Sequence, residues 1–213
     1  MTKVTTPKRR WAMVIDLRQC FGCGACPLVC AQQNETPAKF WRKVEELGEL
    51  ADGQRQRFFL PISCMHCENP HCEAVCPTHA TFRRDDGIVD IDADRCIGCG
   101  YCMLACPYRV RNIFHGHLDF EIKDDFSPQV RNGTCTKCNF CKDRIDDGLA
   151  KGLKPGVDAQ ATPACVVSCS AGALTFGDLN DPQSNVSLLI KKHPIMRINP
   201  ECGTEPAVYY IVP

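Results

Sequence analysis

Short apolar stretches alternate with cysteine-rich loops along the whole sequence. Residues 12–17, 87–91 and 173–176 are mainly apolar or β-branched, and each stands directly before or after a group of cysteines. Apolar runs of this length, bounded by turn-forming residues, are typical of short strands rather than of helices. The pattern therefore predicts a repeat of strand, cysteine loop, short helix and strand.

A hairpin is predicted between two of the cysteine groups. Residues 77–92 lie between Cys76 and Cys96, and the sequence Asp-Asp-Gly at 85–87 lies near the centre of this stretch. An Asp-Gly pair between two strand-forming runs favours a tight β-turn. We therefore expect the two cysteine groups on either side of the hairpin to form one compact module.

The cysteine content needs a covalent or metal explanation, because 18 of the 213 residues are cysteine. Disulfides are typical of small secreted proteins. No signal peptide is recognised here, since Asp16 interrupts the apolar run that follows the basic residues 8–10. Without an export signal of its own, the protein is expected on the cytoplasmic side of a membrane, and export in complex with a partner is the alternative.

Charge and hydropathy exclude two classes of partner. The formal net charge is zero, so a nucleic-acid partner is not expected. No apolar stretch reaches the ~20 residues that span a bilayer, so any membrane attachment must come from another subunit.

Bound clusters would add negative charge, and four cations close to cysteines are candidates to offset it, although ordinary surface roles are an equal alternative: Arg95, Arg109, Lys137 and Arg144.

The cysteines form four groups with ferredoxin-like spacing, numbered here in sequence order. Groups one and three follow C-x2-C-x2-C-x3-C, the run that binds 4Fe–4S clusters in bacterial ferredoxins: Cys20, Cys23, Cys26 and Cys30, then Cys96, Cys99, Cys102 and Cys106. Group two has a longer central loop: Cys64, Cys67, Cys72 and Cys76. Group four carries a long insertion: Cys138, Cys141, Cys165 and Cys169. Structural zinc sites use two well-separated C-x2-C pairs or add histidine, so we expect four iron–sulfur clusters.

Ligand exchange between groups is expected, because the fourth cysteine of such a run binds the neighbouring cluster in two-cluster ferredoxins. The hairpin pairs groups two and three, which leaves groups one and four to pair with each other. Cluster 1 is expected on Cys20, Cys23, Cys26 and Cys169. Cluster 2 is expected on Cys64, Cys67, Cys72 and Cys106. Cluster 3 is expected on Cys96, Cys99, Cys102 and Cys76. Cluster 4 is expected on Cys138, Cys141, Cys165 and Cys30.

The remaining cysteines and the nearby histidines each allow more than one role. Cys135 makes a second C-x2-C-x2-C triplet with Cys138 and Cys141, so it could replace a ligand of cluster 4, or it could be a free buried thiol. Cys202 stands alone and is interpreted as a free thiol. Three histidines near group two could replace a cysteine on iron, but four cysteines already suffice there, so supporting or surface roles are favoured: His66, His71 and His79.

The predicted fold class is α+β, with two interleaved bacterial-ferredoxin-like modules, sparse secondary structure and many loops. The first module comprises residues 10–60 and 125–185, the second comprises residues 61–124, and residues 186–213 form a C-terminal extension. Residues 146–162 are rich in Gly, Lys and Asp and are predicted to be an inserted loop, either a passive excursion or a docking element. Without iron we expect no stable fold, because ligation energy is folding energy in small metal domains.

These motifs resemble the four-cluster iron–sulfur subunits of complex iron–sulfur molybdoenzymes of the dimethyl sulfoxide reductase and polysulfide reductase type. The resemblance covers nearly the whole sequence. It is carried by Cys-Met-His-Cys-Glu-Asn-Pro-His-Cys at 64–72, Asp-Arg-Cys-Ile-Gly-Cys-Gly-Tyr-Cys at 94–102, Lys-Cys-Asn-Phe-Cys-Lys-Asp-Arg at 137–144 and Pro-Ala-Cys-Val-Val-Ser-Cys at 163–169. Ser170, where many relatives have proline, and the long insertion after Cys141 are departures that remove no ligand.

The resemblance implies a non-catalytic electron-transfer subunit in anaerobic respiration. Its partners would be a catalytic subunit carrying molybdenum or tungsten on two pterins and a membrane anchor that exchanges electrons with quinone. It also supports the pairing of group one with four and two with three. A C-terminal transmembrane helix, which the respiratory formate dehydrogenase version of this subunit has, is not expected here. The alternatives are a free-standing polyferredoxin that shuttles between enzymes and a colourless structural zinc protein.

Overall fold

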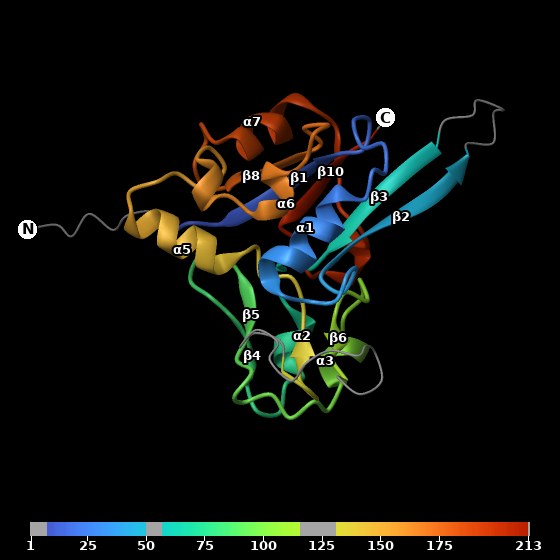
Figure 1. Cartoon of the computed structure of the whole chain (residues 1–213), viewed down its shortest axis with the longest axis vertical. Helices are drawn as coiled ribbons and strands as arrows, with labels where there is room; N and C mark the ends of the chain where they lie inside the picture. Colours follow the sequence, from blue (N-terminus) through green and yellow to red (C-terminus); the bar gives the residue numbers. More distant parts are fainter. Residues whose placement is uncertain (1–7, 50–56, 116–130, 213) are drawn as a thin grey trace, which may run out of the picture.

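A computed structural model describes residues 8–49, 57–115 and 131–212. These residues form two parts (Figure 1). The upper part in that view holds a four-stranded sheet with helices around it, and the lower part holds short hairpins and two short helices. The mixed helices and small sheets confirm the expected α+β class with sparse secondary structure.

The larger sheet brings distant segments of the sequence together. Its strand order is β8-β1-β10-β9, with β1 at Trp11–Asp16, β8 at Leu174–Asp178, β9 at Ile195–Met196 and β10 at Val208–Ile211. All six residues of β1 are buried, as its apolar sequence predicts. β8 runs antiparallel to β1 and places Leu174 opposite Ile15. The strand before group one therefore lies beside the strand after group four.

Helices pack around this sheet, and two of them bring cysteine groups one and four together. α1 (Ala25–Asn34) follows the loop of group one, and α6 (Ala164–Val167) carries the third cysteine of group four. The two helices pack against each other. α7 (Asn185–Lys192) packs on β8 and β1, and Ser184 begins it as an N-cap that accepts from the Ser187 N–H.

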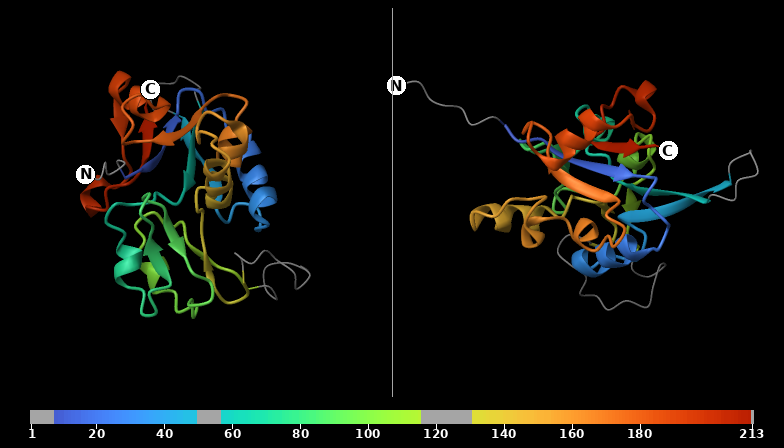
Figure 2. Two further views of the ribbon diagram at one scale, coloured as in Figure 1. Left: turned by 90° about the vertical axis from the view of Figure 1, so that its left-hand side faces the viewer. Right: turned by 90° about the horizontal axis from the view of Figure 1, so that it is seen from above.

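A two-stranded ribbon, not expected from the sequence, extends from the upper part (Figures 1 and 2). It consists of β2 (Arg42–Glu49) and β3 (Arg57–Ser63), which run antiparallel with Arg42 opposite Ser63. A bulge between Glu46 and Gly48 shifts the register by one residue. Charged residues along β2 conceal the alternation that would have indicated a strand.

The lower part contains the predicted hairpin. β4 (Thr81–Arg83) pairs antiparallel with β5 (Val89–Ile91), which confirms the turn at 85–87. α2 (His71–Ala74) and α3 (Tyr101–Leu104) lie in groups two and three and pack together. β6 (Asn112–Ile113) pairs with β7 (Cys135–Thr136), so Cys135 lies in this part of the molecule.

The C-terminal stretch, expected as an extension, joins the larger sheet. β10 pairs parallel with β1, with Met13 opposite Val208. Between α7 and β10 the backbone passes through β9 and the 3₁₀ helix η2 (Pro200–Cys202), and the Glu68 N–H donates to the Glu205 carbonyl at 2.9 Å. Residues 186–212 thus contact both parts of the molecule.

The prediction that residues 146–162 form a loop was wrong for its beginning and its end. Helix α5 extends over Lys142–Ala150, and the short 3₁₀ helix η1 covers Ala159–Ala161. Gly148 of α5 lies so close to Ala161 that a Cβ there would come within 2.3 Å of the alanine Cβ. The composition favoured a loop, but this close packing and the buried Ile145 hold the segment as a helix.

None of the helices formed by the described residues is long and apolar enough to cross a membrane.

Candidate iron–sulfur centres

The four cysteines expected to bind cluster 1 line one small cavity. It lies between the loop of group one and the segment that follows α6, and its cysteines are Cys20, Cys23, Cys26 and Cys169. Val44, Pro61 and Leu174 form its apolar wall. Gly22 and Gly24 both have φ of +74°, which lets the loop curl around the cavity. The structure thus brings the distant Cys169 to the loop of group one.

A second cavity collects the cysteines expected to bind cluster 2. It is lined by Cys64, Cys67, Cys72 and Cys106. Tyr108 and Val110 close it, and the Tyr108 hydroxyl is hydrogen-bonded to Thr204 at 2.5 Å. Burial raises the pKa of Cys67 to about 12, so without a metal this thiol keeps its proton.

The set expected to bind cluster 4 is the most buried one. Cys30, on α1, is buried together with Cys138, Cys141 and Cys165. The Asn34 side-chain amide lies 3.6 Å from the Cys30 Sγ and 3.8 Å from the Cys141 Sγ, so it bridges groups one and four. Burial raises the pKa of Cys138 to about 12 and that of Cys141 to about 11.

In group three the structure places an additional cysteine beside the expected set. The Cys135 N–H donates to the Cys96 Sγ at 3.3 Å, and the Cys135 and Cys102 thiols are hydrogen-bonded at 3.5 Å. Cys135 therefore lies beside group three, whereas its sequence position suggested group four. The expected fourth ligand, Cys76, accepts from the Thr81 N–H at 3.4 Å, and Cys99 is exposed.

The loop of group three leaves no room for side chains at one glycine. A Cβ at Gly98 would come within 2.1 Å of the Gly133 carbonyl oxygen, and φ at Gly98 is +67°. Gly100 also has positive φ, at +78°, but of the residues that the structure describes only Ile113 lies within 4 Å of a Cβ there. Tight turns of this kind aim backbone N–H groups at sulfur, which offsets thiolate charge.

Two buried arginines lie among the thiols, and the sequence had not indicated either of them. Arg42 is 1% exposed and its Nε and Nη1 atoms have no hydrogen-bond partner among the described residues. Arg111 is buried, and its Nη2 donates to the Cys72 Sγ at 3.0 Å. A buried guanidinium without an anion is strongly unfavourable. Anionic iron–sulfur clusters on the surrounding thiolates fit this requirement, whereas neutral thiols do not.

His66 links the loop of group two to the loop of group four. Its imidazole stacks on Phe140 with ring centroids 3.7 Å apart, and its Nδ1 accepts from the Val89 N–H at 3.1 Å. Burial, with the nearby Lys137 and other cations, keeps the pKa of His66 well below its ordinary value, so the ring is neutral. His71 and His79 are exposed.

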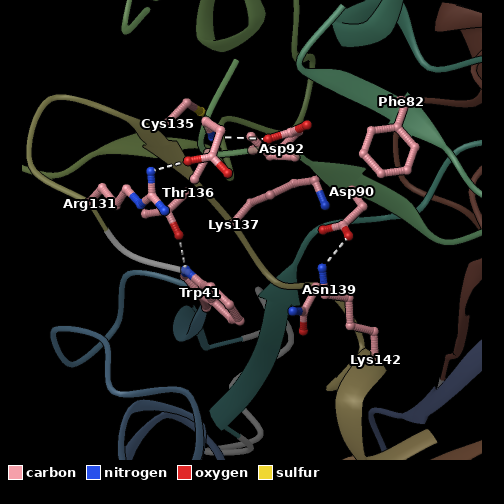
Figure 3. Close-up of a pocket in the computed structure, with 13 residues that line it drawn as sticks. Trp41, Phe82, Asp90, Asp92, Arg131, Cys135, Thr136, Lys137, Asn139 and Lys142 are labelled. Carbon is pink, nitrogen blue, oxygen red and sulfur yellow. Dashed lines mark hydrogen bonds and ion pairs between the residues drawn. The ribbon is translucent and has the colours of Figure 1, made fainter. Parts of the chain in front are cut away.

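A surface cavity next to Cys135 contains one of the cations singled out in the sequence (Figure 3). Lys137 is buried there, and its ammonium donates to the carbonyls of Val89 and Cys138. In the same cavity Lys142 pairs with Asp90 at 2.5 Å. The other three candidates lie nearer the solvent: Arg95 pairs with Asp92, Arg109 is exposed, and Arg144 donates to Gln33, Ala159 and Thr162.

The donor set is suited to clusters rather than to single ions. Within residues 8–49, 57–115 and 131–212, no three His, Cys, Asp or Glu side chains converge closely enough to hold one metal ion. A cubane has four irons between its sulfur ligands, so it needs thiolates that are farther apart than the ligands of one ion. The cavities of the first two sets provide four thiols each, which is the ligand number of a 4Fe–4S cluster.

Comparisons with known proteins agree with this donor set. A family model described as a 4Fe-4S dicluster domain matches residues 55–121. A tetrathionate reductase subunit of Salmonella typhimurium is 39% identical over 211 residues, which cover 97% of this sequence and 74% of the relative. A polysulfide reductase component of Wolinella succinogenes is 36% identical over 206 residues, which cover 95% of this sequence and 94% of the relative.

A protein of Halobacterium salinarum named for the iron–sulfur subunit of a dimethyl sulfoxide reductase is 39% identical over 218 residues, which cover 94% of this sequence and 78% of the relative. These similarities extend over almost the entire sequence, and therefore over the segment that holds the four cysteine groups. The protein is a member of the family of iron–sulfur electron-transfer subunits of dimethyl sulfoxide reductase and polysulfide reductase type complexes.

Proposed function

We propose that the protein relays single electrons through four 4Fe–4S clusters within an oxidoreductase complex. The observation that supports this best is the sharing of cavities between distant cysteine groups. Cys169 of group four lines the cavity of group one, and Cys106 of group three lines the cavity of group two. Exchange of the fourth ligand is the arrangement of two-cluster ferredoxins, and it holds the two clusters of each module close together.

The proposed ligands are those expected from the spacing. Cluster 1 is assigned to Cys20, Cys23, Cys26 and Cys169. Cluster 2 is assigned to Cys64, Cys67, Cys72 and Cys106. Cluster 3 is assigned to Cys96, Cys99, Cys102 and Cys76. Cluster 4 is assigned to Cys138, Cys141, Cys165 and Cys30. The position of Cys135 beside Cys96 and Cys102 supports leaving it out of cluster 4.

The protein's own residues would bind, insulate and tune the clusters. Each cluster supplies a one-electron reduction and oxidation. The thiolates hold the iron, the left-handed glycines curl the loops, and buried side chains such as Phe140 exclude water from the interior. None of these residues needs to act on a substrate, so the chemistry of the complex is assigned to another subunit.

Exposure suggests which clusters meet the partners. Cys23 and Cys99 are exposed, and each lies beside exposed large apolar residues, Phe21 in one loop and Ile97 in the other. The cysteines of set four and most of set two are buried and are joined by the His66–Phe140 stack. This supports an order in which clusters 4 and 2 connect clusters 1 and 3, the two ends of the relay.

The proposed partners are a catalytic subunit carrying a molybdenum or tungsten bis-pterin and a quinone-reactive membrane subunit or soluble carrier. The relatives are named for tetrathionate and polysulfide reductases, so sulfur compounds are candidate substrates of the catalytic partner. A free-standing polyferredoxin remains the second candidate. The exposed apolar residues around Cys23 and Cys99 favour stable partners over it.

The proposal is tested by anaerobic purification of the tagged protein from its native host, with iron, molybdenum and tungsten counted per copy. We expect roughly sixteen irons per copy, together with a larger subunit that carries the second metal. Full iron without a second metal or a partner would favour the polyferredoxin. Protease accessibility in spheroplasts would test the proposed cytoplasmic side of the membrane.

A further inference from the structure

Two of the three buried arginines, Arg42 and Arg111, have no carboxylate partner. Arg10, also buried, pairs with Glu68 at 3.1 Å. The buried carboxylates Asp16 and Asp90 pair with Arg18 and Lys142. In the described parts of the sequence, Arg42, Arg111 and Lys137 are then the buried cations without an acidic side chain, and the Lys137 ammonium donates to two backbone carbonyls instead. The burial of the two arginines needs another source of negative charge.

Arg42 lies near cysteines of the sets expected for clusters 1 and 4, and Val44, two residues further along β2, lines the cavity of the first set. It begins β2, and its Nη2 donates to the Met13 Sδ at 3.0 Å and the Ser63 Oγ at 3.1 Å. Neither acceptor is charged, and Nε and Nη1 are without a partner among the described residues. The thiols that act on its charge belong to both sets of the first module: Cys165, Cys138, Cys26 and Cys30. Burial lowers the pKa of Arg42, but these thiols in their ionised form outweigh burial and raise it.

Arg111 has the corresponding place in the second module. Its Nη2 donates to the Cys72 Sγ at 3.0 Å, which belongs to the set of cluster 2. Its Nη1 donates to the Thr81 Oγ1 at 3.1 Å and lies 3.8 Å from the Cys135 Sγ. Cys135 in turn contacts the thiols of Cys96 and Cys102. Arg111 therefore extends from set two towards set three, and Arg42 lies near sets one and four.

We propose that Arg42 and Arg111 are fixed positive charges, one in each module, that raise the reduction potentials of the two clusters of that module. This inference rests on the proposed four-cluster function. A reduced cluster carries one more negative charge than an oxidised one, so a nearby buried cation stabilises the reduced form. Because the two arginines lie in different modules, each should act mainly on its own pair of clusters.

The proposal is tested by redox titration of the purified complex, monitored by electron paramagnetic resonance, in Arg42→Gln and Arg111→Gln variants. In Arg42→Gln we expect the reduced-to-oxidised ratio of clusters 1 and 4, at a fixed potential, to fall about tenfold, which equals a shift of about 59 mV for one electron. Clusters 2 and 3 should shift much less. In Arg111→Gln the potentials of clusters 2 and 3 should fall, and those of clusters 1 and 4 should shift much less. The signals are assigned beforehand with single Cys→Ser variants.

The Lys variants are the matched controls. Arg42→Lys and Arg111→Lys keep the charge and should restore most of the potential, which a purely structural role of the guanidinium would not predict. If Arg42→Gln does not retain its iron, the Ser63→Asp variant tests the effect of the Arg42 charge while the arginine itself is kept. The new carboxylate would stand beside the Arg42 Nη2 and should lower the potentials of clusters 1 and 4, with Ser63→Ala as its control.

Unchanged potentials in Gln variants that keep their full iron would overturn the inference. Equal shifts in the potentials of all four clusters in either Gln variant would also overturn it. Lys variants whose potentials match those of the Gln variants would overturn it as well. The proposed function fails separately, because the wild-type complex would then lack four one-electron signals or roughly sixteen irons. The wild-type sample therefore tests the function, and the difference between variants tests the arginines.

Discussion

Cys30 belongs to group one by its place in the sequence, but in the folded molecule it lies near a cysteine of group four. It lies on α1, directly after the loop of group one, yet the Asn34 side chain links its Sγ to the Cys141 Sγ of group four. Burial, followed by the nearby Cys138, Cys165 and Cys141, raises the pKa of the Cys30 thiol. Without iron, this thiol is protonated and adds no charge to the interior.

We predict that Cys30→Ser disturbs cluster 4 and leaves cluster 1 intact. The variant should lose about four irons per copy or convert one cluster to a form with fewer irons. Iron analysis with electron paramagnetic resonance checks this. Cys202→Ser is the control, because Cys202 is only partly buried and lies outside the four groups. Loss of the cluster 1 signal alone would contradict the proposed exchange of ligands.

Asp16 stabilises the turn that leads from β1 into the loop of group one. Its carboxylate accepts from the Arg18 N–H at 3.0 Å and from the Arg18 guanidinium at 2.9 and 2.7 Å. The hydrogen bonds from the Arg18 side chain keep the pKa of Asp16 below its ordinary value, although burial opposes this. Because the pKa is lowered by folding, the stabilisation is present above the ordinary value of 3.8 and is lost as the pH falls through the lower, folded value.

We therefore predict that Asp16→Asn lowers the free energy of unfolding at pH 6 and has a smaller effect near pH 3. Anaerobic urea unfolding of the wild type and the variant at both pH values measures the difference. Asp85→Asn is a suitable control, since Asp85 pairs with Lys8 at the surface. An effect of Asp16→Asn that grows with acidity would show that the carboxylate is not the stabilising form.

At the scale of single elements, the cluster loops depend on glycines for two different physical reasons. Gly98 and Gly100 both adopt left-handed backbone conformations in the same loop. Only Gly98 also faces a backbone carbonyl, that of Gly133, at a distance that excludes a Cβ. Since a carbonyl in a turn cannot move as a flexible side chain does, the two positions separate backbone strain from close packing.

We predict that Gly98→Ala destabilises the protein by about 3 kcal/mol or more, the sum of left-handed strain and overpacking. Gly100→Ala should cost only about 1 kcal/mol from strain. Anaerobic urea unfolding of the iron-loaded variants measures both, and Gly98→Ala should release cluster 3 at a lower urea concentration than Gly100→Ala. Equal effects of the two substitutions would show that contact with Gly133 is unimportant.

The sequence predicted elements wherever a local rule applied. The hairpin of β4 and β5 was predicted because Asp-Gly favours one turn, and β1 because its residues before Asp16 are apolar. The second half of α5 was predicted to be loop, since Gly and Asp obscured the apolar face that contains Ile145. Arg42 was missed because its burial depends on β3 and β1. Arg42 and Val44 are two residues apart on β2, so their side chains lie on the same face of the strand. Because Val44 lines a cysteine cavity, this spacing is the local signal that relates Arg42 to the cysteines.

At the scale of the whole molecule, spacing predicted which cysteine groups pair but not how the modules meet. The pairing followed from the reach of a short loop and the length of the hairpin. The contact between modules depends on His66, within group two, and Phe140, within group four, whose rings stack. Phe176 of β8 packs edge-on against Phe140 at 5.3 Å, so the same contact extends into the larger sheet. No local pattern relates these three rings.

The relay also needs an outer surface, and α3 offers one beside group three. Leu104 is 87% exposed at the end of α3, and Ile97 and Tyr101 are exposed nearby in the sequence. The insertion between Cys141 and Cys165 offers a second apolar side chain, Val157, which is 71% exposed. Exposed apolar residues in a group are typical of protein interfaces. Of these two sites, α3 is the one next to a cysteine group with an exposed member.

We predict that Leu104→Ser weakens the binding of a partner subunit at least about tenfold, a loss of ~1.4 kcal/mol. The free energy of unfolding should change by less than about 0.5 kcal/mol, because Leu104 is at the surface. Co-purification of the complex at graded salt, with the iron content as a check on folding, provides the measurement. Val157→Ser is the matched control and should retain the partner. The reverse result, with loss of the partner only in Val157→Ser, would assign docking to the insertion and leave α3 as ordinary surface.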